Sequence, residues 1–185
     1  MKNHNGLTLI ELLIAVVIFG ILASFAVPNF STFVRSNQRT AAYNSMAGTI
    51  NLARLEAIKR SRVVVLCASS DLNTCQATAG ANWNEGWLVF VDEDGDSVLD
   101  GGEVVLKREP AGPNGFTITS SLGAMISLAP RGRLRSQGSV VICDNGNTEN
   151  AMALNLWVTG LGRMATDGDG NGVVEDITGA DVSCP

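Results

Sequence analysis

The feature that most constrains this chain is an apolar run of 21 residues near its amino terminus, from Leu7 to Val27. Only Thr8, Glu11 and Ser24 carry polar side chains within it. A run of roughly 20 apolar residues is long enough to cross a bilayer as a helix. A carboxylate inside such a segment is energetically costly, so Glu11 is expected to have a function and a charged partner.

A polar hexapeptide precedes this run, and the string Gly6-Leu7-Thr8-Leu9-Ile10-Glu11 joins the two. This arrangement resembles the class III signal of type IV pilins and pseudopilins. The resemblance implies that a prepilin peptidase cuts between Gly6 and Leu7 and that the new amino terminus, Leu7, is methylated. It also implies that Glu11 docks one subunit on the next. Leu7 departs from the family, in which the first mature residue is usually Phe.

Two other interpretations of the apolar run remain open. Ser24-Phe25-Ala26 has the small-x-small pattern of a secretory cleavage site. The run is also long enough to be a plain membrane anchor. A carboxylate four residues into the apolar run, and a leader with a single Lys, fit a secretory signal poorly. We therefore favour the pilin-type signal.

The composition excludes several classes of function. The 185 residues are enough for one domain with a real core, and the net charge of -5 provides no overall attraction to nucleic acid or anionic lipid. The one histidine, His4, lies in the leader, so a processed chain has no imidazole for general-base catalysis or zinc binding. The sequence also lacks a P-loop and a nucleotide-binding glycine motif. We predict that the protein is not an enzyme and uses no cofactor.

Four cysteines follow the apolar run: Cys67, Cys75, Cys143 and Cys184. An even number in an exported domain favours two disulfides over free thiols. Four cysteines allow three pairings. We choose Cys67–Cys75, which closes a short loop, and Cys143–Cys184, which ties down the carboxyl-terminal tail. The spacing does not fit a zinc site, because no two cysteines are close enough in sequence.

The helix is expected to continue beyond the apolar run, from about Leu7 to about Arg60. Five residues that step by three and four predict one buried helix face: Tyr43, Met46, Ile50, Ala53 and Ala57.

After Arg60 the sequence changes to short β-rich runs separated by Gly, Asn, Asp and Pro. A long helix followed only by strands predicts an α+β fold, in which antiparallel sheet covers one helix face. The expected strands are Val63–Cys67, Trp87–Val91, Val104–Lys107, Phe116–Thr119, Met125–Leu128, Ser139–Cys143 and Leu154–Thr159.

Two Asp-rich stretches match parts of an EF-hand calcium loop. Asp92-Glu93-Asp94-Gly95-Asp96 is followed by Glu103 at the twelfth position, but Ser97 stands where that loop needs Gly. Asp167-Gly168-Asp169-Gly170-Asn171-Gly172 matches the first half, but Thr178 replaces the bidentate Glu. We expect an acidic hairpin turn and a polar tail, and we predict no metal site, although calcium remains an alternative at both.

The segment Arg131-Gly132-Arg133-Leu134-Arg135 is the most concentrated basic motif. If it is extended, its three guanidinium groups lie on one face, about 6–7 Å apart, because side chains alternate along a strand. This spacing suits contacts with phosphate groups. The alternative is a solvated turn whose arginines pair with nearby carboxylates.

The body of the chain, through Gly86-Trp87-Leu88-Val89-Phe90 and the acidic turn, resembles the FimT/FimU-type minor pilins and the H pseudopilin of type II secretion. Some FimT-like members bind DNA through a Gly-Arg-x-Arg motif after the last strand. Gly132-Arg133-Leu134-Arg135 has these letters but lies earlier. Gly162-Arg163-Met164-Ala165 has the expected place but lacks the second Arg. The resemblance thus makes Arg131, Arg133, Arg135 and Arg163 candidate DNA contacts.

The resemblance predicts a pilin fold with three parts: a leader at residues 1–6, a membrane-spanning and filament-core half-helix at 7–29, and a periplasmic β-rich domain at 30–185. It implies a bacterial inner-membrane protein with one span that later enters a filament. Its expected partners are the prepilin peptidase, the inner-membrane assembly platform, and other minor and major pilins. We expect a type IV minor pilin, with a DNA-binding minor pilin for natural transformation and a type II secretion pseudopilin as alternatives.

Overall fold

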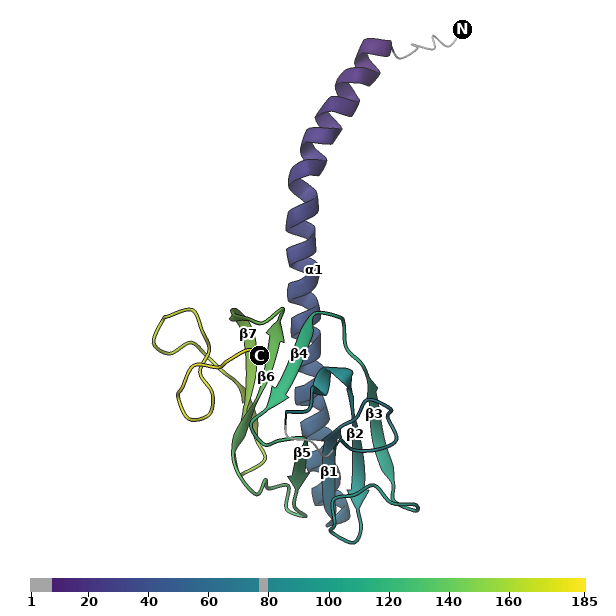
Figure 1. The fold of residues 1–185 in the computed structure, drawn as a ribbon, viewed down its shortest axis with the longest axis vertical. Coiled ribbons are helices and arrows are strands. Elements are labelled where there is room, and N and C mark those ends of the chain that lie inside the picture. Colours follow the sequence, from purple (N-terminus) through teal and green to yellow (C-terminus); the bar gives the residue numbers. More distant parts are fainter. Residues whose placement is uncertain (1–7, 77–79) are drawn as a thin grey trace. The chain divides into compact units, whose positions relative to one another are not determined.

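The computed structural model describes residues 8–76 and 80–185, and for residues 23–29 it describes the backbone alone. The chain divides into two compact units, Met1–Gln38 and Arg39–Pro185. Helix α1 (Leu9–Arg60) begins in the first unit and ends in the second (Figure 1). Within the first unit, the apolar side chains from Leu9 to Leu22 are largely exposed. In the described part of the chain, no helix combines the length and the apolarity needed to cross a membrane.

The part of α1 in the second unit buries one face, as its sequence predicts. All five residues of the predicted stripe are buried: Tyr43, Met46, Ile50, Ala53 and Ala57. The two alanines at the end of this stripe have short side chains, which lets the strands approach the helix backbone closely. Thr49 is also fully buried there, and its hydroxyl donates to the carbonyl of Ser45 at 2.7 Å.

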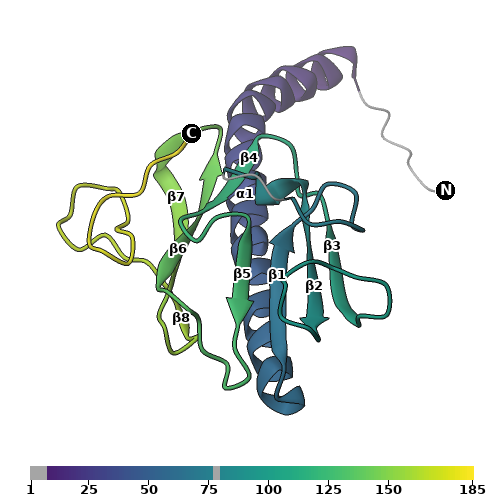
Figure 2. The same cartoon turned by 60° about the horizontal axis from the view of Figure 1, so that its bottom comes forward.

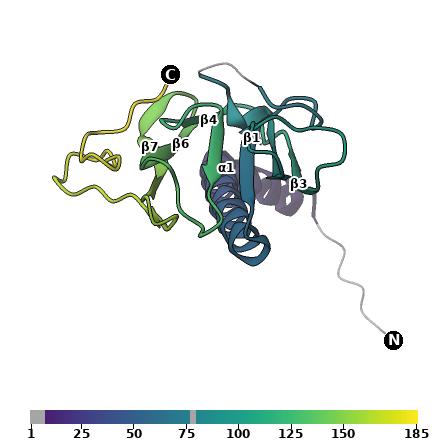
Figure 3. The ribbon, with the colours of Figure 1, turned by 90° about the horizontal axis from the view of Figure 1, so that it is seen from below.

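Two four-stranded antiparallel sheets lie on this part of the helix (Figure 2). The first has the strand order β3-β2-β1-β5 and the second has the order β4-β6-β7-β8. Seen along the helix, both sheets cover the same side of it (Figure 3). The strands of the first sheet are β1 (Val63–Ala68), β2 (Gly86–Asp92), β3 (Val105–Pro110) and β5 (Met125–Leu128), with the short 3-10 helix η1 (Trp83–Glu85) before β2. Those of the second are β4 (Phe116–Ser120), β6 (Gly138–Asp144), β7 (Asn147–Leu156) and β8 (Gly162–Met164).

The main core lies between the helix stripe and the inner faces of both sheets. Strand β1 alternates strictly: Val64 and Leu66 enter this core, whereas Val65 and Cys67 form a second cluster on the outer face. The outer face of the second sheet also carries a cluster, where residues of the carboxyl-terminal tail pack on β6 and β7. Both sheets are therefore covered on two faces over part of their area.

The predicted α+β pilin fold is confirmed. Seven strands were expected at nearly these positions, but the last of them was misplaced. Strand β7 begins at Asn147, directly after the Asn145-Gly146 turn, rather than at Leu154. Both turn residues have positive φ, 50° and 71°, as a tight two-residue hairpin requires. Strand β8 was not predicted, because Gly162, Arg163 and Met164 are all exposed and show no alternation.

Candidate functional site

The predicted cleavage and methylation site, Gly6 and Leu7, lies outside the described residues. Glu11, the predicted docking residue, lies in the first turn of α1. Its carboxylate accepts from the backbone N–H and the hydroxyl of Thr8, both at 3.4 Å, and the Glu11 N–H donates to the Thr8 hydroxyl at 3.3 Å. This reciprocal pair is a capping box, which satisfies backbone donors that a helix start leaves open. The arrangement holds the Glu11 carboxylate at the helix start.

Both disulfides have the pairing chosen from the sequence. Cys67 joins Cys75 with their Cα atoms 5.5 Å apart, and Cys143 joins Cys184 at 5.8 Å. The first bond closes a small loop organised by Asp71. Hydrogen bonds from the backbone N–H groups of Asn73 and Thr74 to this carboxylate hold the pKa of Asp71 well below its usual range.

The second disulfide attaches the tail to β6. Val182 is buried with Cys143 and Ala153 on the outer face of the second sheet. The tail folds back on itself through the Val182 N–H, which donates to the Val174 carbonyl at 3.0 Å. The polar tail predicted from its composition is therefore a defined loop, attached by a covalent bond and by apolar contacts.

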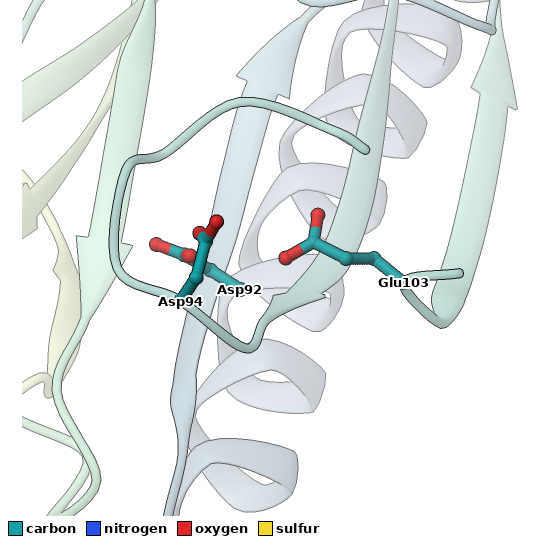
Figure 4. A group of neighbouring side chains, drawn as sticks. All are labelled: Asp92, Asp94 and Glu103. Carbon is teal, nitrogen blue, oxygen red and sulfur yellow. The ribbon is translucent and has the colours of Figure 1, made fainter. Parts of the chain in front are cut away.

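The first Asp-rich stretch forms the loop between β2 and β3. Asp92 is 2% exposed, and its two carboxylate oxygens accept from the N–H groups of Gly95 at 2.7 Å and Ser97 at 3.2 Å. Glu103 closes the loop by accepting from the Glu93 N–H at 2.8 Å. Carboxylate oxygens of Asp92, Asp94 and Glu103 lie within 4.8 Å of one another (Figure 4). The predicted hairpin between these two strands is present, but its connection from Glu93 to Val104 is a long loop and not a tight turn.

The many carboxylates in this loop raise the pKa of Asp100. Repulsion from Asp96 is the main cause that raises the pKa of Asp100, with burial, Asp94 and Glu103 adding to it.

The tail holds a comparable acidic cluster, in which carboxylate oxygens of Asp167, Asp169 and Glu175 also lie within 4.8 Å of one another. There the Gly172 N–H is the main cause that lowers the pKa of Asp167. Oxygen ligands of this kind suit hard cations such as Ca²⁺.

The basic motif lies in the connection between β5 and β6. Its burial alternates: Gly132 and Leu134 are buried, whereas Arg131, Arg133 and Arg135 are exposed. Gly132 has a φ of +68° and faces α1, since a Cβ built on it would lie 2.8 Å from Ile58 Cδ1. The Gly132 N–H donates to the Ala129 carbonyl at 2.7 Å, so the first part of the motif is a turn and not an extended segment. The solvated turn that we gave as the alternative is therefore found here, with all three arginines exposed.

The second motif, around Arg163, follows a turn that packs against the first motif. The Leu134 N–H donates to the Val158 carbonyl at 3.0 Å. Gly160 has a φ of +74°, and a Cβ there would collide with the carbonyl oxygen of Gly132. The guanidinium of Arg163 lies 6.0 Å from the ring centre of Trp157, within cation–π range. The sequence separates these motifs by about 30 residues, and periodicity gives no signal that they meet.

A groove of about 440 Å³ opens beside β5. Arg133 and Arg135 line it, together with Met125, Ser127 and Leu134. Among the residues that the structure describes, neither arginine has a carboxylate within ion-pair distance. The pairing with nearby carboxylates that we considered from the sequence is therefore not formed.

Comparison with known proteins matches both parts of the chain. The family model for the prokaryotic N-terminal methylation motif matches residues 1–27. The family model described as "Type II transport protein GspH" matches residues 42–162. Among characterised relatives, the type IV major fimbrial protein FimA of Dichelobacter nodosus is 31% identical over 124 residues, which covers 66% of this chain and 70% of FimA. The pilin-like protein PilA1 of Thermus thermophilus is 37% identical over 101 residues, covering 55% and 56% of the two chains.

Two solved structures have the same fold. The type IV minor pilin FimU of Pseudomonas aeruginosa superposes with a TM-score of 0.58 at 19% identity, over 83% of this chain and 99% of that one. The minor pseudopilin EpsH of the Vibrio cholerae type 2 secretion system gives 0.50 at 11% identity, over 71% and 99%. With its methylation motif and its matched globular domain, the chain belongs to the GspH family of type IV pilin-like proteins.

Proposed function

We propose that this protein is a minor pilin of a type IV pilus, which is cut after Gly6, methylated at Leu7 and then incorporated into the pilus fibre or used to prime its assembly. The observation that carries the proposal is the order of features along the chain. A processing motif at residues 1–27 includes the start of helix α1 (Leu9–Arg60), and the family domain follows at 42–162. The family is one of structural proteins, and this member is not an enzyme.

Before assembly, the chain is held in the bacterial inner membrane by the apolar segment at 7–29, with the domain from residue 30 in the periplasm. The prepilin peptidase and the inner-membrane assembly platform act on it there. In the fibre, the exposed apolar side chains of α1, such as Leu13 and Phe19, pack against other minor and major pilins. Because these side chains lie in lipid before assembly, close packing between helices, and not removal from water, favours the assembled state.

Glu11 is the docking group in this proposal. A carboxylate in an apolar environment needs a positive partner, and the charged amino terminus of a neighbouring subunit provides one. The Thr8 cap supports this role, because it keeps the carboxylate in the first helical turn beside its own chain end. Cleavage after Gly6 would leave the new amino group of each subunit at Leu7, four residues before the Glu11 of the same subunit. Each subunit would then present a positive and a negative group near the same end of its helix.

Replacement of Glu11 by Val tests this proposal in the organism that makes the filament. We expect the E11V chain to be cleaved normally and to be missing from sheared filaments, where an immunoblot detects the wild type. E149Q, which removes an exposed charge on β7, is the matched control and should enter filaments normally. Wild-type amounts of E11V in the filaments would contradict the docking role.

A second candidate is a pseudopilin of type II secretion. The description of the matched family and the fold shared with EpsH favour it. Deletion of the gene distinguishes the two roles: loss of surface pili and of pilus-driven motility supports the pilin. Loss of protein secretion with intact pili supports the pseudopilin.

A third candidate is a DNA-binding minor pilin for natural transformation. The closeness of the two arginine motifs favours it: the turn with Arg131 packs against the turn at Gly160, and strand β8 with Arg163 follows that turn directly. The full chain in detergent micelles should then shift a short duplex at low salt. The slope of log affinity against log salt should fall by about 0.9 for each phosphate-contacting arginine replaced by Ser. The absence of any shift at low salt would exclude this candidate.

A further inference from the structure

The first disulfide closes a loop that leaves β1 and returns to it. Cys67 lies in β1 and is 0% exposed, whereas Cys75, eight residues later, is half-buried. A backbone hydrogen bond joins the residues that directly follow the two cysteines: the Gln76 N–H donates to the Ala68 carbonyl at 2.8 Å. The base of the loop is therefore held by a contact other than the bond between the two sulfurs.

One carboxylate bridges the two sides of this loop. Oδ1 of Asp71 accepts from the Ser69 hydroxyl at 3.0 Å and from the Thr74 N–H at 2.8 Å, and Oδ2 accepts from the Thr74 hydroxyl at 2.8 Å. Ser69 directly follows β1, is fully buried and donates its own N–H to the first residue of β2 at 2.9 Å. Thr74 directly precedes Cys75. Asp71 thus ties the segment that carries Cys75 to a fixed point beside β1.

Further contacts define the conformation between these two points. Leu72 has a φ of +59°, which is uncommon for a residue with a side chain. Its N–H donates to the Ser69 hydroxyl at 3.0 Å, and its carbonyl accepts from the Arg108 guanidinium at 2.9 Å. Its side chain packs on the cluster around Cys67 on the outer face of the first sheet. The loop therefore has a defined fold whose contacts do not require the disulfide.

A loop that is folded before oxidation selects among the possible cysteine pairings. In an unfolded chain, the cost of closing a loop rises only with the logarithm of its length, so short pairings are favoured weakly. In the folded loop, the Cα atoms of Cys67 and Cys75 are 5.5 Å apart, within the range that a disulfide requires. Holding two thiols in this arrangement raises their effective concentration for each other.

We propose that Asp71 is a positioning residue for the first disulfide: its carboxylate holds the reduced loop closed, so that Cys75 pairs with Cys67 rather than with Cys143 or Cys184. The inference concerns how the exported domain acquires its native pairing, and it does not rest on the proposed filament function. It also gives the exposed loop between β1 and β2 a role of its own.

The bond forms by exchange with a small disulfide such as oxidised glutathione. The Cys75 thiolate attacks one sulfur of glutathione disulfide and releases one glutathione thiolate. The Cys67 thiolate then attacks the Cys75 sulfur of the mixed disulfide and releases the second glutathione thiolate. Two protein thiols are oxidised, one glutathione disulfide is reduced, and the two thiol protons pass to glutathione. Asp71 acts on the second step, because it keeps Cys75 within reach of Cys67.

The test uses the full chain in detergent micelles, equilibrated with glutathione buffers of graded redox ratio. Free thiols are then alkylated, and mass spectrometry of tryptic peptides gives the equilibrium constant of each disulfide separately. We expect D71A to lower the constant for Cys67–Cys75 at least about fivefold, because a carboxylate is a strong hydrogen-bond acceptor. The constant for Cys143–Cys184 should change by less than about twofold, since distant sites act independently.

Asp176 provides the matched control. Its carboxylate also organises a loop, by accepting from the N–H and the hydroxyl of Thr178 at 2.7 Å and 2.6 Å, but this loop belongs to the tail. D176A should therefore leave the constant for Cys67–Cys75 unchanged. In concentrated urea, where the loop is unfolded, D71A and the wild type should give the same constant. When the reduced chain is oxidised without urea, D71A should form more mispaired disulfides than the wild type.

Equal constants for Cys67–Cys75 in D71A and the wild type would overturn the proposal. A parallel fall in the constants of both disulfides would also overturn it, because that result indicates a general loss of the fold. A difference that persists in urea would show that Asp71 acts on thiol chemistry rather than through the folded loop, and would contradict the positioning role. An unchanged proportion of mispaired chains in D71A would contradict the selection of Cys67 as the partner of Cys75.

Discussion

Removal of the two disulfides one at a time should destabilise the protein by unequal amounts. In the chain-entropy description, a cross-link stabilises the fold by restricting the unfolded chain, and the effect grows with the logarithm of the loop length. Cys143–Cys184 spans 41 residues and Cys67–Cys75 spans 8. These lengths correspond to about 4 kcal/mol and about 2.5 kcal/mol. The C143A/C184A pair should therefore unfold at the lower urea concentration.

The two pairs are well matched for this comparison. Cys67 and Cys143 are 0% and 1% exposed, so substitution by Ala removes a similar buried sulfur in each case. Unfolding is followed by the fluorescence of the buried Trp83 and Trp87 on the full chain in mild detergent. Hydrogen exchange at the amide of Val182, which donates to the Val174 carbonyl, reports separately on release of the tail. An equal or larger loss of stability for C67A/C75A would refute the loop-length reasoning.

Two further substitutions test local features. G160A should lower the free energy of unfolding by at least twice as much as G170A. Both glycines have positive φ, a backbone conformation that costs a residue with a side chain about 1–2 kcal/mol. Only at Gly160 would the added Cβ also collide with the Gly132 carbonyl. Equal losses in urea unfolding would contradict the close approach of the two turns. D100N should raise stability at neutral pH and lose this advantage as the pH falls through the raised pKa of Asp100, because protonation then relieves the same repulsion in the wild type. A D100N advantage that persists unchanged at pH 3 would exclude repulsion as its cause.

The helix and most strands could be predicted because their residues carry local signals. The stripe from Tyr43 to Ala57 repeats at the helical period, and runs such as Val63–Cys67 are β-branched and continuous. Strand β7 was shortened because its first residues, Asn147–Asn150, are polar and read as a loop. The hairpin turn before it pairs Asn147 with Asp144, and after a shift in register Met152 pairs with Ile142 of β6. The residue pattern of a segment does not predict a strand that forms because the adjacent strand pairs with it.

Some candidate site residues could likewise be identified from the sequence, and others could not. Glu11 and the four cysteines could be identified from position and number, because a charge in an apolar run and an even cysteine count are properties of the chain itself. The proximity of the two arginine motifs could not be predicted, because it depends on the turns at Gly132 and Gly160, which pack together although they are far apart in sequence. The groove is lined by residues of β1, β2, β5 and the connection after β5, which only the order of the strands in the sheet brings together.

In the proposed function, this chain is processed and becomes part of a filament. Mass spectrometry of the amino terminus in sheared, purified filaments tests both steps. We expect a peptide that begins at Leu7, carries an N-methyl group and disappears from the filaments in the E11V strain. A chain recovered with Met1–Gly6 still attached, or one absent from every filament preparation of the wild type, would contradict it.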